Sequence, residues 1–142
     1  MNDIIPTAAV LVLKDDKILL VKHAEGARHI TGIYGLPGGG IDDGENAKEA
    51  ALRELWEETG LKTSLEDLVD FPGNEFFATI ERKDGNKNFS WKVFLCRNFT
   101  GDLQSSDETY PEWIIAKDLD KLPLLPNVKD AYQNAEKYLE SI

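Results

Sequence analysis

The sequence predicts an α/β domain in which a mixed β-sheet is covered by helices on both faces. Short runs rich in apolar and β-branched residues alternate along the chain with segments of helical periodicity. The first run, residues 7–13, is apolar at nearly every position, which is typical of a strand covered on both faces. The length of 142 residues suffices for one domain, residues 1–142, with its own core.

The composition, 42% hydrophobic and 30% charged, is that of an ordinary globular protein. The N-terminal segment lacks the basic start and long apolar core of a signal peptide, and no apolar run reaches membrane-spanning length. Cys96 is the only cysteine, which excludes an internal disulfide and a cysteine-based zinc site. We therefore expect a cytoplasmic protein, a monomer or homodimer, that does not associate with membranes.

The net charge of −10 argues against polymeric nucleic acid as a partner, because binding to a nucleic-acid backbone needs a basic face. A small phosphate ligand would be repelled as well, unless divalent cations bridge it to the acidic side chains. A phosphate ligand is therefore expected only where clustered carboxylates can bind divalent cations.

The chain begins with a predicted β-hairpin. Its strands are expected at residues 7–13 and 17–22, and Asp15-Asp16 make the turn between them. Both strands are largely apolar, so both are expected in a sheet that is covered on both faces.

Two loop-like segments follow the hairpin. Residues 23–33 carry the cationic side chains Arg28 and His29. Residues 34–40 end in three glycines, which permit positive φ and close approach of the backbone to a ligand, so we expect Gly39 to contact the substrate. The segment is not a nucleotide P-loop, because no Gly-Lys-Ser/Thr follows it.

A helix is predicted over residues 47–59. Asn46 and Glu49 are spaced as a capping box, and Gly60 is placed as a left-handed stop. One side of this helix is expected to pack on the body of the protein: Leu52, Leu55, Trp56 and Thr59.

The other side of the helix is acidic. Glu54, Glu57 and Glu58 are neighbours at i, i+3 and i+4, where like charges destabilise a helix by a few tenths of a kcal/mol per pair. The same sector contains Ala47 and Ala50, whose small side chains are expected to leave room for a bulky group. This arrangement predicts a site that receives a cation.

The second half of the chain is predicted to add strands around residues 68–82 and 89–99, joined by a turn at Asp84-Gly85-Asn86. A short strand at 112–115 and a helical turn at 117–122 follow. Trp91 and Trp113 are expected in the core or on the sheet, although an aromatic near the site could stack on a base.

The chain ends with a predicted helix over residues 128–142, for which Asn127 is a plausible N-cap. The residues expected on its inner side are Val128, Ala131, Ala135, Tyr138 and Leu139.

Residues 39–61 resemble the Nudix box. Gly39, five residues, Glu45, seven residues and then residues 53–61 (RELWEETGL) satisfy every fixed position of G-x5-E-x7-R-E-U-x-E-E-x-G-U. Two predicted strands precede the box, and Leu-Pro-Gly-Gly leads into it. The chain is thus similar to the Nudix hydrolases, in particular the MutT-like nucleoside diphosphate-X pyrophosphohydrolases. The resemblance implies an α/β/α sandwich around a central mixed β-sheet.

The resemblance also implies a reaction: hydrolysis of a nucleoside diphosphate linked to another group, by attack of water on phosphorus with Mg²⁺ or Mn²⁺. The first expectation is a small-molecule nucleoside triphosphate cut to monophosphate and pyrophosphate. ADP-ribose or another sugar nucleotide is the alternative substrate. A module that senses a nucleotide without cleaving it is the alternative of another class, although such modules usually lose the box carboxylates.

Roles for the box residues follow from the resemblance. Glu57 and Glu58 would be metal ligands, helped by the Gly38 carbonyl. Glu54 would be a further ligand or the base that takes a proton from water. Arg53, one turn before Glu57, would orient that carboxylate by an i,i+4 ion pair.

The resemblance says less about the role of Glu45 and about the acid that lies downstream of the box. Glu45 is a box position with an expected structural role. One more acid from a downstream loop often completes such sites, and the candidates are Asp107, Glu108 and Glu112, of which Glu108 is preferred.

Substrate contacts are expected from two further regions by the same resemblance. Asn127 lies near the position of an asparagine that reads a purine edge in MutT-type enzymes, while its role as a helix cap stays open. Lys22, His23, Arg28 or His29 could meet phosphate oxygens.

Overall fold

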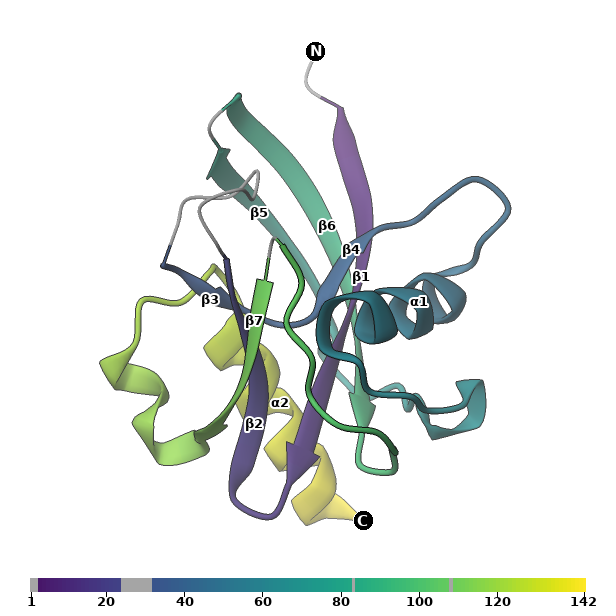
Figure 1. Ribbon diagram of the computed structural model, residues 1–142, viewed down its shortest axis with the longest axis vertical. Helices are drawn as coiled ribbons and strands as arrows, with labels where there is room; N and C mark the ends of the chain where they lie inside the picture. Colours follow the sequence, from purple (N-terminus) through teal and green to yellow (C-terminus); the bar gives the residue numbers. More distant parts are fainter. Residues whose placement is uncertain (1–2, 24–31, 83, 108) are drawn as a thin grey trace.

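The computed structural model describes residues 3–23, 32–82, 84–107 and 109–142 (Figure 1). The helices are α1 (Ala47–Thr59) and α2 (Val128–Ser141), with short 3-10 turns η1 (Leu65–Asp67) and η2 (Ala116–Lys121). The strands are β1 (Ile4–Lys14), β2 (Lys17–His23), β3 (Tyr34–Gly35), β4 (Gly38–Gly40), β5 (Glu75–Arg82), β6 (Gly85–Cys96) and β7 (Thr109–Ile115).

Strand β1 joins the two wings of a curled, mixed sheet. It pairs in parallel with β6, whose other edge pairs with β5, and antiparallel with the short β4. The predicted hairpin with β2 is present, but it pairs only at its turn end, Leu13 with Ile18 and Lys14 with Lys17. Beyond these pairs β2 leaves β1; it pairs with β7 along its whole length and with β3 at Val21 and Lys22. One wing is therefore β4-β1-β6-β5 and the other is β3-β2-β7.

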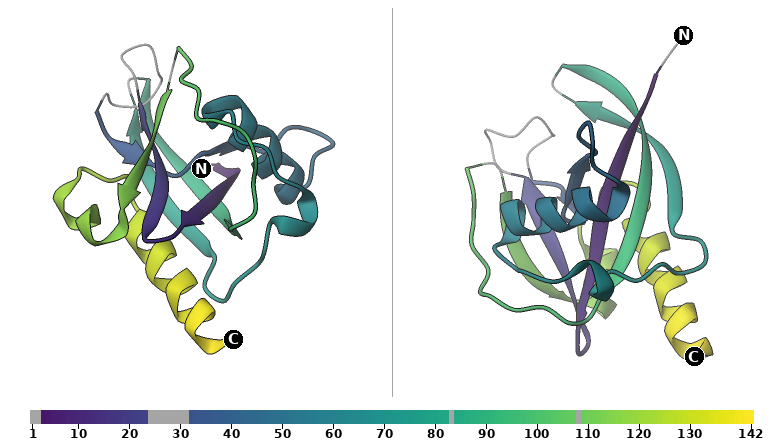
Figure 2. Two further views of the ribbon diagram at one scale, coloured as in Figure 1. Left: turned by 60° about the horizontal axis from the view of Figure 1, so that its bottom comes forward. Right: turned by 90° about the vertical axis from the view of Figure 1, so that its right-hand side faces the viewer.

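The helices cover opposite faces of this sheet (Figure 2). Helix α1 packs on the face that carries Ala8 and Val10, and α2 packs on the face that carries Leu11 and Val93. Because β1 alternates between these faces, almost all of its central residues are buried, as the apolar run predicted. The predicted α/β class with a mixed sheet and helices on both faces is confirmed.

Helix α1 has the predicted bounds, and its capping box and left-handed Gly60 are both present. The predicted packing side is wrong in one respect: Leu55 and Thr59 are buried, but Trp56 is 55% exposed. Ala50 and Ala51 are fully buried instead, so these small side chains bring the helix close to the sheet and leave no open space. This rotation turns Trp56 outward and turns part of the acidic sector inward.

The second half differs from prediction mainly at element ends. Strand β5 begins at Glu75, β7 begins at Thr109, and the β5–β6 hairpin closes with Arg82 opposite Gly85. Asn127 is the N-cap residue of helix α2, as predicted, but it has φ of 74° and its side chain makes no capping hydrogen bond. Within the described ranges, no helix is long and apolar enough to cross a bilayer.

Candidate functional site

A cavity of about 430 Å³ lies where the two wings diverge. Glu54 and Glu58 of α1 and the glycines of β4 contribute to its lining. Phe89 and Trp91 of β6 line it from one wing, and His23 and Thr109 line it from the other. The register explains the aromatic wall, because alternate residues of a strand point to the same face.

The glycines of β4 allow α1 to bring its carboxylates against the backbone. The Gly38 N–H donates to Glu58 Oε1 at 2.6 Å. A Cβ atom at Gly39 would lie 2.6 Å from Cδ of Glu54, so only glycine leaves space for that carboxylate. The expected positive φ is absent at Gly38, Gly39 and Gly40, which are extended strand residues. The glycines are thus required because the Glu54 and Glu58 carboxylates approach the backbone of β4 closely.

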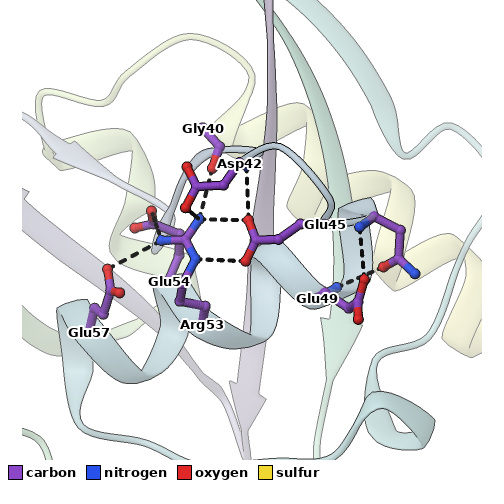
Figure 3. Close-up of polar contacts among 8 residues, drawn as sticks. Gly40, Asp42, Glu45, Glu49, Arg53, Glu54 and Glu57 are labelled. Atoms are coloured by element: carbon purple, nitrogen blue, oxygen red, sulfur yellow. Dashed lines mark hydrogen bonds and ion pairs between the residues drawn. The ribbon is translucent and has the colours of Figure 1, made fainter.

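Arg53 holds the outer side of this cluster together (Figure 3). Its Nε and Nη2 donate to the two carboxylate oxygens of Glu45 at 2.8 and 3.0 Å. Nη1 donates to Glu54 Oε1 at 2.8 Å and to Glu57 Oε2 at 3.3 Å, and Nη2 also donates to the Gly40 carbonyl at 3.0 Å. A guanidinium has five N–H donors, and five hydrogen bonds are formed.

The predicted pair of Arg53 with Glu57 is therefore present, but the bidentate partner is Glu45. Oε1 of Glu45 also accepts from the Asp42 N–H at 2.9 Å. The hydrogen bonds from Arg53, followed by the one from Asp42, lower the pKa of Glu45 to about 2. Helical spacing could not reveal this pair, because Glu45 precedes the helix and reaches Arg53 through the loop that follows β4. The fixed spacing of the box was the one available signal.

Glu54 has the opposite electrostatic environment. Its side chain is 16% exposed, and burial raises its pKa, an effect that Arg53 opposes and that the neighbouring charges of Glu57 and Asp42 reinforce. A carboxylate whose pKa moves toward neutrality is a better general base than an exposed one.

The donor set suits a hard divalent cation, since Glu54, Glu57 and Glu58 offer only carboxylate oxygens. Glu54 and Glu58 share the cavity, whereas the Glu57 side chain is 48% exposed and paired with Arg53. Among the described residues, no three His, Cys, Asp or Glu side chains gather closely enough to hold a metal ion. A shared ion would therefore require Glu57 to turn away from Arg53.

The downstream acids are only partly located. Glu108, the preferred candidate, lies outside the described residues. Its neighbour Thr109 is buried and donates from Oγ1 to the Glu58 carbonyl at 3.3 Å, so this segment runs beside the end of α1. Asp107 and Glu112 are exposed.

Of the cationic residues expected to bind phosphate, the structure describes His23 and Lys22. His23 is buried and lines the cavity. Lys22 is exposed on β2, with its Nζ 5.9 Å from the centroid of the Tyr34 ring. Arg28 and His29 lie outside the described residues.

A narrow apolar slot adjoins the cavity, and Trp91 lines both. Leu36, Phe76 and Leu125 form much of the slot, and Asn127 closes it at the start of α2. Nδ2 of Asn127 is buried there without a hydrogen-bond partner in the described part of the chain. The sequence did not predict that Trp91 and Asn127 line the same slot, because this arrangement brings together the middle of β6 and the start of α2.

Comparisons with known proteins agree with this geometry. A family model described as the NUDIX domain matches residues 4–136. An ADP-ribose pyrophosphatase of Methanocaldococcus jannaschii is 32% identical over 122 residues, which cover 84% of this chain and 66% of the relative. An oxidized purine nucleoside triphosphate hydrolase of Danio rerio is 33% identical over 116 residues, which cover 80% of this chain and 66% of the relative.

The chain thus spans just under two thirds of the length of these two relatives. The solved structure of a MutT protein from Methanosarcina mazei Go1 has a TM-score of 0.79 at 23% identity and covers 96% of this chain and 95% of that one, a likeness that concerns the fold. Because the family model spans nearly all of the described elements and every fixed position of the box is present, the chain belongs to the Nudix family.

Proposed function

We propose that this chain is a metal-dependent nucleotide pyrophosphohydrolase that converts a nucleoside triphosphate to the monophosphate and pyrophosphate. The observation that carries the proposal is the approach of Glu54 and Glu58 to the β4 glycines at the wall of one cavity. The cavity adjoins an apolar slot of about 20 Å³, which a nucleobase would enter by displacing the side chains that line it. One ligand could thus place its base and its phosphates in these two spaces.

Nudix hydrolases generally use divalent metal ions such as Mg²⁺ or Mn²⁺. In this chain Glu57, Glu58 and the Gly38 carbonyl would hold the ion, with Glu108 as the downstream acid. When bound, the ion neutralises charge on the pyrophosphate and lowers the pKa of the attacking water.

The base of the reaction is Glu54. Its Oε1 is engaged by Arg53, which leaves Oε2 to accept the proton of the attacking water. Arg53, expected among the catalytic residues, acts through the carboxylates of Glu45, Glu54 and Glu57 and is a positioning residue in this proposal.

The substrate side of the proposal rests on the slot. Asn127 would read the edge of a purine, Gly39 would lie against the phosphates, and Arg28 and His29 would meet phosphate oxygens. The similarity to an oxidized purine nucleoside triphosphate hydrolase supports a purine triphosphate. The similarity to an ADP-ribose pyrophosphatase supports a sugar nucleotide as the second candidate.

A substrate panel tests the proposal. Purified protein is incubated with ATP, GTP, 8-oxo-dGTP, ADP-ribose and GDP-mannose, each with Mg²⁺ and with EDTA, and the products are separated by chromatography. We expect Mg²⁺-dependent release of monophosphate and pyrophosphate from a purine triphosphate. Binding of nucleotides without turnover under every condition would instead identify a sensing module.

A further inference from the structure

Arg82, the last residue of β5, has a side chain that the box chemistry does not use. It lines the same cavity as Glu54 and Glu58 and is only 11% exposed. Its Cζ lies 5.6 Å from the centroid of the Phe89 ring, so the guanidinium lies over that aromatic face. Its Nε is buried and has no hydrogen-bond partner among the described residues. The Asp84 carboxylate, 3.9 Å from Nε, forms a long ion pair at most.

A guanidinium in this position is costly for the folded protein. Removing a charge from water is unfavourable unless hydrogen bonds and an opposite charge replace the water. The ring of Phe89 supplies part of this compensation, but an aromatic face accepts none of the in-plane N–H groups. An anionic ligand that enters the cavity would supply the missing acceptors, and guanidinium binds phosphate in a bidentate manner.

The register places Arg82 at the end of the cavity away from the slot. Phe89 pairs with Ile5, Trp91 with Thr7 and Val93 with Ala9, so these levels follow one another along β1 and β6. Trp91 and Val93 line the slot with Asn127, whereas Arg82 lies over Phe89, one level farther out.

The glycines that contact the carboxylates lie at the levels from Trp91 to Val93. Gly38 pairs with Ala9 and Gly40 with Thr7, and these glycines approach Glu58 and Glu54. Among the described residues that line the cavity, Arg82 is the only arginine or lysine, so a nucleotide with its scissile phosphates at the carboxylates would find a guanidinium for the remaining group there.

We infer that Arg82 binds the terminal phosphate of a nucleoside triphosphate and thereby selects triphosphates over sugar nucleotides. The inference rests on the proposed function, since it assumes a nucleotide in the slot and the cavity. A terminal phosphate offers two charged oxygens to the guanidinium, whereas a neutral sugar in the same place offers only hydroxyl groups. Arg82 is thus a specificity-determining residue.

Kinetics of four proteins test this: the wild type, Arg82→Gln, Arg82→Lys and the control Arg97→Gln. Arg97 is an exposed cation beyond the other end of β6 and does not line the cavity. We expect Arg82→Gln to lose about 10- to 100-fold in kcat/KM for GTP, mainly through KM, because a charged hydrogen bond to phosphate is lost. The loss for GDP-mannose should stay below about threefold, Arg82→Lys should recover part of the loss for GTP, and Arg97→Gln should match the wild type.

A binding measurement separates this inference from the proposed function. Calorimetry with Mg²⁺ compares a methylene-bridged GTP analogue with GMP, and circular dichroism verifies that each variant is folded. We expect Arg82→Gln to weaken binding of the analogue by a similar factor and to leave GMP unchanged. Equal effects on both ligands, or none on the analogue, would overturn the role of Arg82. Absence of turnover in the wild type would instead overturn the proposed function, and the binding comparison would still decide the role of Arg82.

Discussion

At the scale of single residues, Glu45 and Glu54 share one guanidinium but have pKa values shifted in opposite directions. Arg53 donates two hydrogen bonds to Glu45, one to each carboxylate oxygen, and one to Glu54. Glu45 is thereby held as a carboxylate far below neutral pH, while burial keeps the pKa of Glu54 above its ordinary value. Two acids on the same arginine thus have different electrostatic environments, and in the proposed reaction Glu45 is the anchor and Glu54 the base.

Replacement of Glu54 tests the base. Glu54→Gln keeps the shape of the side chain and a hydrogen-bond acceptor for Arg53 but cannot take a proton. We expect kcat to fall about 10²- to 10⁴-fold, the contribution typical of a general base, with the melting temperature nearly unchanged. Steady-state hydrolysis with Mg²⁺ measures this, and Glu66→Gln, an exposed carboxylate on η1, is the matched control. A kcat within threefold of the wild type would exclude Glu54 as the base.

The pKa of Glu45 predicts a pH dependence of stability. Because the folded value, about 2, lies below the ordinary value of about 4.3, the folded state favours the carboxylate. The stabilisation is complete above pH 4.3 and is lost as the pH falls from there toward 2. The difference in the free energy of unfolding between wild type and Glu45→Gln should therefore be constant from pH 7 to 5 and should shrink by pH 3.5.

Urea unfolding in EDTA at these pH values measures the difference, and Glu66→Gln again serves as control. A difference that keeps its full size at pH 3.5 would contradict the assigned role of the Arg53–Glu45 pair.

At the scale of elements, β4 and α1 form one unit because carboxylates of α1 lie directly against the backbone of β4. Gly38 donates its N–H to Glu58, and Gly39 leaves space for Glu54. The buried Ala50 and Ala51 bring the helix axis close enough for both contacts. The orientation of the acids is therefore a property of the helix–strand pair.

Alanine substitutions along β4 separate these effects. At Gly39 the new Cβ meets the end of the flexible Glu54 side chain, so we expect a large loss of activity with little loss of stability. At Gly38 it would lie 2.4 Å from the Ala8 carbonyl oxygen, and this backbone clash should cost about 1–3 kcal/mol of stability. At Gly40 no atom lies within 4 Å of the new Cβ, so Gly40→Ala is the control.

Thermal unfolding and steady-state kinetics on the three variants measure these outcomes. If Gly39→Ala were as active as Gly40→Ala, the contact between Gly39 and Glu54 would have no bearing on the reaction.

At the scale of the whole molecule, the site exists because β1 and β2 separate after two residue pairs. Near their turn, α2 packs across the core formed by both wings, with Leu11, Leu20 and Ala131 among its buried residues. Away from the turn the wings diverge around the cavity, and α2 begins beside the adjoining slot with Asn127. The cavity and the slot are thus lined by segments that are far apart in the chain.

The slot predicts a change in base preference. Asn127→Gly removes the amide while keeping the left-handed backbone, since φ is 74°. We expect the preference of kcat/KM for a purine over a pyrimidine triphosphate to shrink about 10-fold, the value of a lost hydrogen bond to the base. The free energy of unfolding should hardly change, because Nδ2 has no partner in the described part of the molecule. An unaltered ratio would restrict Asn127 to its place at the start of α2.

The sequence by itself determined what depends on residues close together in the chain. The bounds and caps of α1, the acidic spacing of the box and membership of the family all follow from local patterns. Only the tertiary structure decided the inward turn of Glu54 and the outward turn of Trp56. It also decided that Trp91 and Asn127 line one slot and that Arg82 lines the cavity. These features depend on helix rotation and strand register, which result from packing among segments far apart in the chain and leave no periodicity in the sequence.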